Sequence, residues 1–299
     1  MLTPQERNDL ITAAKLYYEE NLTQAEVAAR LGVSRPTVSK MLTRARETGI
    51  VHIEVRTAEE GNAELLKNLQ QRYHLQGGLV LRKEDGIWQQ AARYLALELP
   101  YAHHVGLGWG YAIGEVVNEL CRLGGRHEGV VYPLIGKAHI PNKGYHPDEL
   151  VRLWSASCGR QLCVMNCPAF PDSEEERESY EAGAAYKAIY RLWQQTDAAV
   201  LGIKGYPGVP DEATATRFGD ALQRQKAVGS FLSYYYNSRG EFISGNNDFC
   251  MHVPLSMLRH CSKVIGILAD DNVKAAEGAL KTGIITHIIL TEKTAQQLL

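Results

Sequence analysis

The sequence predicts an α/β protein in which a small, all-helical N-terminal unit precedes a larger unit built on a mostly parallel sheet. Near the start of the chain, apolar residues recur every three or four positions between helix caps, which is typical of short amphipathic helices. Beyond about residue 57, short apolar runs alternate with helical segments, as in parallel strands covered on both faces. We therefore place one domain at residues 1–56 and a second at 57–299.

Length and composition agree with two globular domains. The chain has 299 residues, of which 45% are hydrophobic and 22% charged, ordinary values for a globular protein. There is no apolar run long enough to span a bilayer and no apolar leader at the N-terminus, so we expect a cytoplasmic protein without a membrane partner. Six cysteines are too few for a disulfide scaffold and suit a reducing compartment.

Three short helices are expected in the first fifty residues. The first covers residues 8–20, with an apolar stripe formed by Leu10, Ala14, Tyr17 and Tyr18. Thr23 caps the second helix in a capping box with Glu26, and Gly32 ends it. Ser34 caps the third helix, which tolerates Pro36 in its first turn. The side chains that this helix buries are Val38, Met41, Leu42 and Ala45.

The third helix carries most of a basic segment. Residues 29–46 hold five basic and no acidic side chains; because the whole chain carries −2 and this segment +5, the rest carries −7. A basic island on an acidic body indicates that one small face meets phosphate.

The spacing around Gly32 is typical of a helix-turn-helix, whose second helix lies in the major groove of DNA. The residues expected to contact double-stranded operator DNA are Thr23, Gln24, Ser34, Arg35, Thr37, Ser39, Lys40 and Arg44. Arg35 is assigned to a guanine edge, and Lys40 and Arg44 to phosphates. The plainer alternative is a three-helix unit whose basic face is only solvated. A strand at 51–55 is expected to add a wing.

The larger unit is expected to begin with a connecting helix within residues 57–76, which is also a candidate for dimer formation. Its apolar side chains are Leu65, Leu66, Leu69 and Tyr73. Strands are expected at 78–81, 130–135, 198–203, 264–268 and 288–290, and one helix from Glu174 to about Trp193. Because ligands of parallel sheets bind beyond the carboxyl ends of the strands, the loops after these runs are the candidate ligand sites.

One of these loops, residues 105–110, is rich in glycine and leads from a strand into a helix at 111–123. Its spacing is not that of a dinucleotide fingerprint, because the third glycine position falls on Tyr111; no nicotinamide cofactor is expected. A tight turn packed under Trp109 is the alternative to a ligand site. Cys158, Cys163 and Cys167 lack a C-x-x-C pair and indicate buried thiols rather than a metal site.

Several segments, taken in order, resemble the SorC family of sugar-binding, DeoR-type bacterial transcriptional regulators. They are residues 22–28, 108–110, 133–136, 197–203, 227–229 and 274–295. The resemblance implies an N-terminal helix-turn-helix and a Rossmann-like effector domain related to sugar-phosphate isomerases that has lost catalysis. It also implies a homotetramer on palindromic operators and an effector that is usually a phosphorylated sugar, with no cofactor.

The resemblance also assigns an effector site. Its residues are Gly108, Trp109, Gly110, Gly136, Lys137, Ser230, Asn237, Asp270, Asp271 and Lys274. The chain has Asp270 and Asp271 where the family has two glycines, and a phosphate cradle does not tolerate nearby carboxylates. We therefore expect a neutral sugar or polyol, held by Asp270, Asp271, Ser230 and Asn237, or else a phosphate bound elsewhere, for instance at Lys137.

These expectations predict a transcriptional regulator of a carbohydrate-catabolism operon, controlled by a sugar, polyol or sugar phosphate bound to its C-terminal domain. Two alternatives remain. One is a sugar-phosphate isomerase with a DNA-binding appendage, whose general base would be Asp270, Glu292 or Lys274. The other is a constitutive DNA-binding scaffold with a degenerate pocket. Because no group that orients such a base can be named, a non-enzyme is expected.

Overall fold

The computed structural model describes residues 4–20, 22–48, 50–51, 62–82, 86–138, 145–207 and 214–299. Contacts within the chain separate two units, Met1–Ala58 and Glu59–Leu299, and each is described by itself. The predicted fold class, a helical N-terminal unit and a mostly parallel α/β unit, is confirmed. The predicted boundary at 56–57 lies outside the described residues, as does nearly all of the predicted wing strand.

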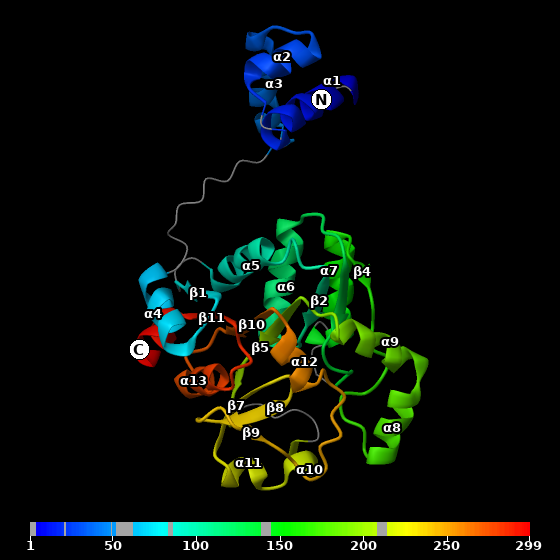
Figure 1. Cartoon of the computed structure of the whole chain (residues 1–299), viewed down its shortest axis with the longest axis vertical. Coiled ribbons are helices and arrows are strands. Elements are labelled where there is room, and N and C mark those ends of the chain that lie inside the picture. The colour runs from blue at the N-terminus through cyan, green and yellow to red at the C-terminus, as the bar shows by residue number, and fades with distance from the viewer. Residues whose placement is uncertain are drawn as a thin grey trace. The chain divides into compact units, whose positions relative to one another are not determined.

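The N-terminal unit is a bundle of short helices (Figure 1). Its elements are α1 (Pro4–Ala14), the π-helix η1 (Lys15–Glu19), α2 (Gln24–Leu31) and α3 (Arg35–Glu47). The wider π turn shifts the phase of the first helix, so that Leu16 is buried and Tyr18 is 37% exposed. The predicted stripe is therefore wrong at Tyr18. Leu16 joins Val27, Val38 and Leu42 in one core.

The predicted caps of α2 and α3 are confirmed. The Glu26 N–H donates to Thr23 Oγ1 at 3.3 Å, and the Thr23 N–H donates to Glu26 Oε2 at 2.8 Å, which completes the capping box. Gly32 ends α2 with a φ of 66°. The Thr37 N–H donates to Ser34 Oγ at 3.3 Å, so that Ser34 caps α3. These caps fix the angle at which α3 leaves the turn.

A seven-stranded sheet, parallel throughout, forms the centre of the C-terminal unit (Figure 1). In spatial order its strands are β1 (Gly77–Leu81), β11 (His287–Thr291), β10 (Lys263–Leu268), β5 (Ala198–Gly202), β2 (His104–Leu107), β3 (Val130–Pro133) and β4 (Gln161–Leu162). All five strands predicted from apolar runs are present.

The sheet is apolar on both faces, which explains why its strands are continuously apolar in sequence. In β5, for example, Val200 packs into the core on one face and Leu201 into the core on the other. Helices on the Val200 face are α5 (Ile87–Glu98), α6 (Tyr111–Leu123) and α7 (Pro147–Cys158). Helices with side chains in the Leu201 core are α4 (Ala63–Tyr73), α9 (Ala184–Trp193), α12 (Leu255–His260), α13 (Val273–Lys281) and α14 (Glu292–Leu298).

One helix prediction needs correction. The helix predicted from Glu174 to Trp193 is two helices, α8 (Glu174–Ala182) and α9, because Gly183 between them takes an extended conformation with φ −69° and ψ 150°. The apolar face of α4 packs into its own unit, with Leu69 fully buried and Leu65, Leu66 and Tyr73 partly buried; its part in a dimer stays a prediction. The remaining helices are α10 (Thr214–Phe218) and α11 (Ala221–Arg224).

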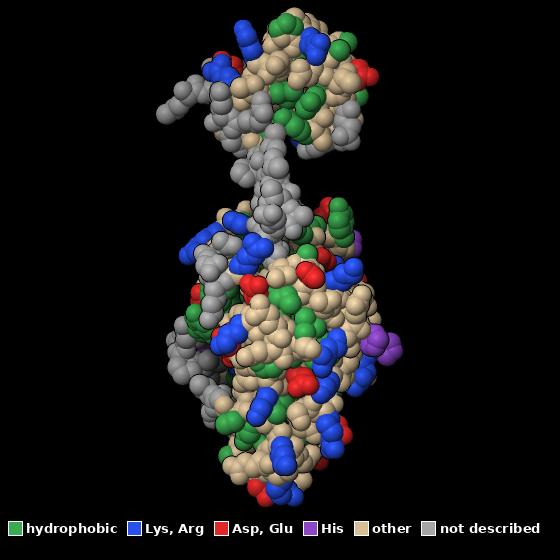
Figure 2. Space-filling model, turned by 90° about the vertical axis from the view of Figure 1, so that its left-hand side faces the viewer, with side chains coloured by type: hydrophobic (Ala, Val, Ile, Leu, Met, Phe, Trp, Pro, Cys, Tyr) green, Lys and Arg blue, Asp and Glu red, His purple; other side chains and the backbone are tan. Residues whose placement is uncertain are grey.

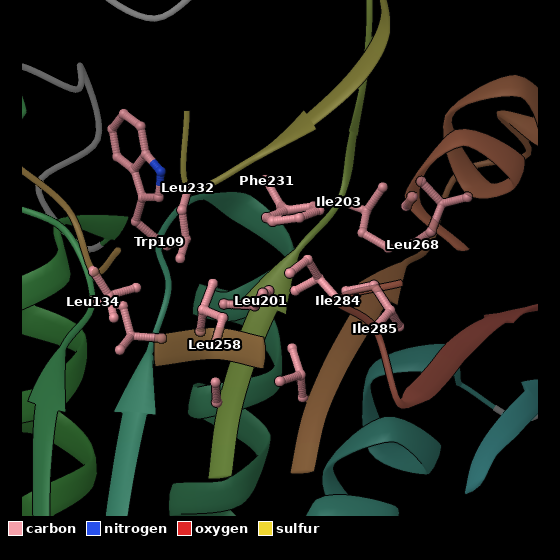
Figure 3. Packing of buried hydrophobic residues seen from close by; sticks show 14 of the residues in the cluster. Trp109, Leu134, Leu201, Ile203, Phe231, Leu232, Leu258, Leu268, Ile284 and Ile285 are labelled. Carbon is pink, nitrogen blue, oxygen red and sulfur yellow. The ribbon is translucent and has the colours of Figure 1, made fainter. Parts of the chain in front are cut away.

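A second, antiparallel sheet was not predicted. Its strands are β6 (Lys204–Gly205), β7 (Ala227–Phe231), β8 (Tyr234–Asn237) and β9 (Phe242–Ile243). The Tyr236 hydroxyl donates to the Ala275 carbonyl at 3.0 Å, which fixes this sheet to α13. Figure 3 shows apolar side chains filling the space between it and the carboxyl ends of the parallel strands. No helix among the described residues combines the length and apolar composition needed to cross a bilayer.

Candidate nucleic-acid interface and effector site

The predicted DNA contacts lie at the surface of the N-terminal unit. Ser34, Arg35, Ser39 and Arg44 are exposed, whereas Val38 on the same helix is fully buried. Thr37, Lys40 and Thr23 are exposed as well, and Gln24 is half-buried. The basic face of α3 is thus open to solvent within its own unit, which is the condition for docking in a groove of DNA.

Some predicted contacts already serve the helix caps. Ser34 Oγ lies 2.8 Å from Thr37 Oγ1, and the Thr23 hydroxyl donates to Glu26 Oε2 at 2.7 Å. Hydrogen bonds from Thr23 hold the pKa of Glu26 below its usual value. Arg35 and Ser39 have no comparable capping role in the described contacts, and their contact with bases stays a prediction.

A groove of about 490 Å³ lies beside three of the predicted contacts. Its lining residues are Glu6, Asp9, Leu10, Thr12, Leu31, Val33, Thr37, Lys40, Met41 and Arg44. Thr37, Lys40 and Arg44 thus border the groove, whereas Arg35 and Ser39 lie outside it. Figure 2 shows one face of this unit, where hydrophobic side chains reach the surface between basic and acidic ones. The carboxylates of α1 therefore accompany the two cations assigned to phosphates.

In the C-terminal unit, a lysine lies beside the glycine-rich loop that follows β2. Lys204 Nζ is 4.6 Å from the centre of the Trp109 ring, a cation–π contact, and would be 3.5 Å from a Cβ placed at Gly110. Gly110 begins α6 with a φ of 95° and no capping side chain. The Gly108 and Gly110 N–H groups donate to the Val200 and Tyr145 carbonyls, at 2.8 and 3.4 Å, so the loop is a candidate ligand site because of its place beyond β2 and beside Lys204. Sequence reasoning missed Lys204, although it follows a predicted strand directly.

Strand β6 also joins this loop to the loop after β10. Lys204 and Gly205 are consecutive; Lys204 contacts Trp109, and the amide of Asn272 occupies the space where a side chain at Gly205 would stand. Asn272 is the N-cap of α13 and directly follows Asp270 and Asp271. The structure therefore brings together two of the loops predicted to bind the effector.

The two aspartates and Lys274 are differently engaged. Asp271 accepts a hydrogen bond from Thr291 Oγ1 at 2.8 Å and pairs with Lys293 at 3.0 Å. Asp270 accepts the Asn272 N–H at 3.2 Å and stays exposed, as does Lys274. Asp271 is thus bound to the start of α14, while Asp270 and Lys274 remain accessible to a ligand.

Lys137 is held within a polar cluster of its own. Its Nζ lies 3.3 Å from Asp148 Oδ2 and 3.3 Å from Asn166 Oδ1. Gly136 precedes it and packs against the Pro168 backbone, which leaves no room for a side chain. Asp148 is buried and also accepts the Met165 N–H at 3.1 Å. A phosphate at Lys137 would compete with the carboxylate of Asp148.

The two predicted residues of the antiparallel sheet are separated. Ser230 is buried in β7 and pairs in register with Lys204, close to the glycine loop. Asn237 lies at the other end of the hairpin, where its side chain donates to Glu241 Oε2 at 2.8 Å and accepts the Arg239 N–H at 2.9 Å. The hydrogen bonds of the Asn237 side chain thus close a turn.

Aromatic rings stand beside the same helix start. Tyr111 makes edge-to-face contacts with Trp88 and Tyr145, each at 5.6 Å between ring centres. The Tyr145 hydroxyl donates to Glu115 Oε1 at 3.0 Å, and burial together with this carboxylate raises the pKa of Tyr145. Rings near convergent polar groups are typical of small-molecule sites. Their wide separation in sequence hid this group from motif analysis.

One of the three cysteines predicted to be buried thiols, Cys167, lies beside Lys137, whose N–H donates to the Cys167 carbonyl at 2.9 Å. The prediction of buried thiols is confirmed for Cys158 and Cys167, whereas Cys163 is partly exposed. Burial raises the pKa of Cys167 to about 12, so its thiol is neutral at physiological pH. Among the described residues there is no group of three side chains arranged to bind a metal ion.

Known proteins match both units. A family profile described as "Putative sugar-binding domain" matches residues 58–299, and a profile of sigma-70 region 4 matches residues 2–48. The chain is 26% identical to the sorbitol operon regulator of Klebsiella pneumoniae, over 97% of each chain, and 26% identical to the deoxyribonucleoside regulator of Bacillus subtilis, over 96% of each.

A solved structure supports the same relationship. The crystal structure of the full-length sorbitol operon regulator SorC from Klebsiella pneumoniae superimposes with a TM-score of 0.72, covering 98% of this chain and 99% of that one. With the exposed basic helix and the parallel sheet described above, these matches show that the chain belongs to the SorC family of transcriptional regulators and carries the sugar-binding domain of that family.

Proposed function

We propose that this chain is a DNA-binding transcriptional regulator of a carbohydrate-catabolism operon, and that a sugar, polyol or sugar phosphate bound to its C-terminal unit controls DNA binding. One observation supports this most strongly: a single chain joins a helical unit with an open basic face to a sugar-binding domain over residues 58–299. The named relatives, regulators of sorbitol and deoxyribonucleoside genes, support the same class of target. We further propose that it acts in the cytoplasm as a homo-oligomer, a tetramer, without catalytic activity.

For DNA, we propose that the second helix of the motif, α3, docks in the major groove of each half of a palindromic operator. Arg35 and Ser39 read bases, Lys40 and Arg44 bind phosphates, and Thr23, Gln24, Ser34 and Thr37 position the helix ends on the backbone. Half-sites should lie about 10 base pairs apart, or a multiple of that spacing.

For the effector, we propose a site formed by the loops after β2 and β10 and by β6 between them. Gly108, Trp109 and Gly110 line the site, Lys204 supplies the cation, the buried Ser230 contributes its hydroxyl, and the exposed Asp270 and Lys274 form the polar rim. Gly136, Lys137, Asp271 and Asn237 belong to the predicted set but have structural partners. A phosphate fits best at Gly110 and Lys204, and hydroxyl groups fit the Asp270 side.

A thermal-shift screen of the full chain tests the effector proposal. Sorbitol, free hexoses and deoxyribose are compared with their phosphates. If the Gly110–Lys204 end binds phosphate, the phosphorylated compounds raise the melting temperature and the variant Lys204→Met loses that response. The control is Lys187→Met, which replaces an exposed lysine on α9. If only the neutral compounds raise the melting temperature, the effector is recognised through its hydroxyl groups on the Asp270 side.

DNA binding is tested by footprinting the full chain on DNA upstream of neighbouring metabolic genes, with and without the compounds that shift the melting temperature. A protected palindrome whose occupancy changes with the effector supports the regulator. Turnover of a sugar phosphate without any footprint would favour the isomerase alternative instead. A footprint that no compound alters would favour a constitutive scaffold.

A further inference from the structure

The tip of the β7–β8 hairpin has an unfavourable backbone conformation. The two residues that join the strands, Leu232 and Ser233, have φ values of 48° and 63°. Hairpin turns of this kind normally carry Asn and Gly, because other side chains are strained at positive φ. Strained residues persist only where the surroundings hold them in place. The neighbours of this turn therefore identify what holds it.

Two side chains bind the carbonyl groups of the turn. His252 Nδ1 donates to the Leu232 carbonyl at 2.8 Å, and the Arg217 guanidinium donates to the Ser233 carbonyl at 3.2 Å. Arg217 is only 3% exposed, and its Nε donates to Asp248 Oδ1 at 2.9 Å. A guanidinium bound on two sides is fixed in orientation, so Arg217 holds the Ser233 carbonyl in one place.

The turn rests on the glycine loop of the proposed effector site. A Cβ placed at Gly108 would be 3.4 Å from Leu232 Cδ2, and Figure 3 shows Leu232 beside Trp109. Arg217 reaches Trp109 by a second route: it lies over the Phe170 ring at 4.7 Å, and that ring is 6.3 Å from Trp109. Both the turn and Phe170 thus support Trp109, and Arg217 contacts both.

We propose that Arg217 is a positioning residue for the effector loop: paired with Asp248, it holds the left-handed turn at Leu232 and Ser233 against Gly108 and Trp109. Its bearing on effector binding rests on the function proposed above. In the described contacts Arg217 reaches that loop through Leu232 and Phe170.

The test follows the position of Trp109 without any effector. The full chain is labelled with 5-fluorotryptophan, and the fluorine resonance of Trp109 is assigned with Trp109→Phe. In Arg217→Met we expect this resonance to move by more than its linewidth while that of Trp154, in the core on the other face of the sheet, stays in place. If Arg217→Met fails to fold, the same measurement is made on Arg217→Lys, which keeps the charge but cannot bind Asp248 and the Ser233 carbonyl as a guanidinium does.

The matched control is Arg160→Met. Arg160 is as deeply buried, at 2% exposure, but lies over Trp154 at 5.6 Å instead of near Trp109. This variant should move the Trp154 resonance and leave that of Trp109 unchanged. Equal displacement of both resonances by both arginine variants would show a general loosening of the unit and overturn the proposal.

A second substitution, in the turn itself, tests whether Arg217 acts by holding the turn or only by pairing with Asp248. Ser233→Gly removes the strain at φ 63° and, combined with Arg217→Met, should return the Trp109 resonance toward its original position; Ser233→Ala, which keeps the strain, should not. Rescue by both, or a Trp109 resonance that never moves, contradicts the positioning role. If Trp109 moves but no sugar binds the unaltered chain, the proposed function fails and the role of Arg217 stands.

Discussion

The two units use their polar side chains in opposite ways. In the N-terminal unit, the residues assigned to DNA are exposed, and the apolar side chains that support them are separate. In the C-terminal unit, Lys137, Ser230 and Asp271 are buried or bound to neighbours as well as being candidates for an effector. Substitutions of DNA residues outside the helix caps, such as Arg35, should therefore change DNA binding without changing stability, whereas substitutions of the buried or paired residues of the second unit should change both ligand binding and stability.

The largest effect that we expect from this contrast is a loss of stability when Arg160 is replaced. Its buried guanidinium donates to the carbonyl groups of Ala102, Glu128 and Leu99, at 2.6, 2.7 and 2.8 Å. Arg160→Met leaves these carbonyls without that donor and should lower the free energy of unfolding by about 3 kcal/mol in urea titrations. The exposed Arg152 on α7 is the control, because its replacement by Met should change little. Similar losses in both variants would break the contrast.

At Arg35 the opposite outcome is expected. Arg35→Ala should weaken binding to the specific operator by about 1–3 kcal/mol, relax the preference at one base pair, and leave the melting temperature unchanged. Fluorescence anisotropy with the footprinted operator and its single-base variants measures this. Arg7→Ala, an exposed charge on α1 of the same unit, is the control for net charge. An equal loss on operator and random DNA would remove Arg35 from base reading.

The cap at Thr23 is a place where the N-terminal unit should lose stability. Thr23→Ala removes the hydroxyl that accepts the Glu26 N–H and should destabilise α2 by about 1 kcal/mol. Hydrogen exchange followed by mass spectrometry should show about fivefold faster exchange of the α2 amides. Exchange of the β5 amides in the other unit is the internal control. Unchanged α2 exchange would mean that the capping box contributes nothing.

Lys40 should act on DNA of any sequence. Lys40→Ala removes one phosphate contact, so it should weaken specific and random binding alike and lower the slope of log affinity against log salt by about 1. Binding isotherms at several salt concentrations, with Arg35→Ala alongside, give this slope. A sequence-dependent loss would exchange the roles of the two residues.

The smallest effect concerns pH. Thr23 lowers the pKa of Glu26 in the folded protein, so this carboxylate stabilises α2 above its unfolded pKa, and the stabilisation is lost as pH falls through the lower folded pKa. Glu26→Gln should remove this acid dependence from α2 exchange, compared with the unaltered chain at each pH. Identical profiles for the two proteins would count against the assignment.

The sequence predicted best what depends on neighbouring residues. The caps at Thr23, Gly32 and Ser34 depend on residues within three positions, and all three are observed. The parallel sheet was also predictable, since strands buried on both faces carry unmistakable apolar runs. Phase errors such as Tyr18 arose where a π turn, which has no clear sequence signal, altered the helical period.

The effector site was only partly predictable, because its arrangement depends on distant pairings. Lys204 enters the site through β6, a two-residue strand. This strand pairs with β7, from which helices α10 and α11 separate it in sequence, and such short strands have no periodic pattern. Asp270 and Asp271 were treated as alike, yet only Asp271 faces Thr291 and Lys293. Which of two adjacent carboxylates finds a partner is decided by the tertiary fold.

The place of β1 at the edge of the sheet bears on how the protein is made. Its neighbour is β11, near the other end of the chain, and the Arg72 guanidinium of α4 reaches the Leu299 carbonyl, 227 positions away. During translation the helical DNA-binding unit can fold as soon as it leaves the ribosome, whereas the parallel sheet stays open until its last strand emerges. The nascent chain therefore carries a folded N-terminal unit before its C-terminal unit is folded.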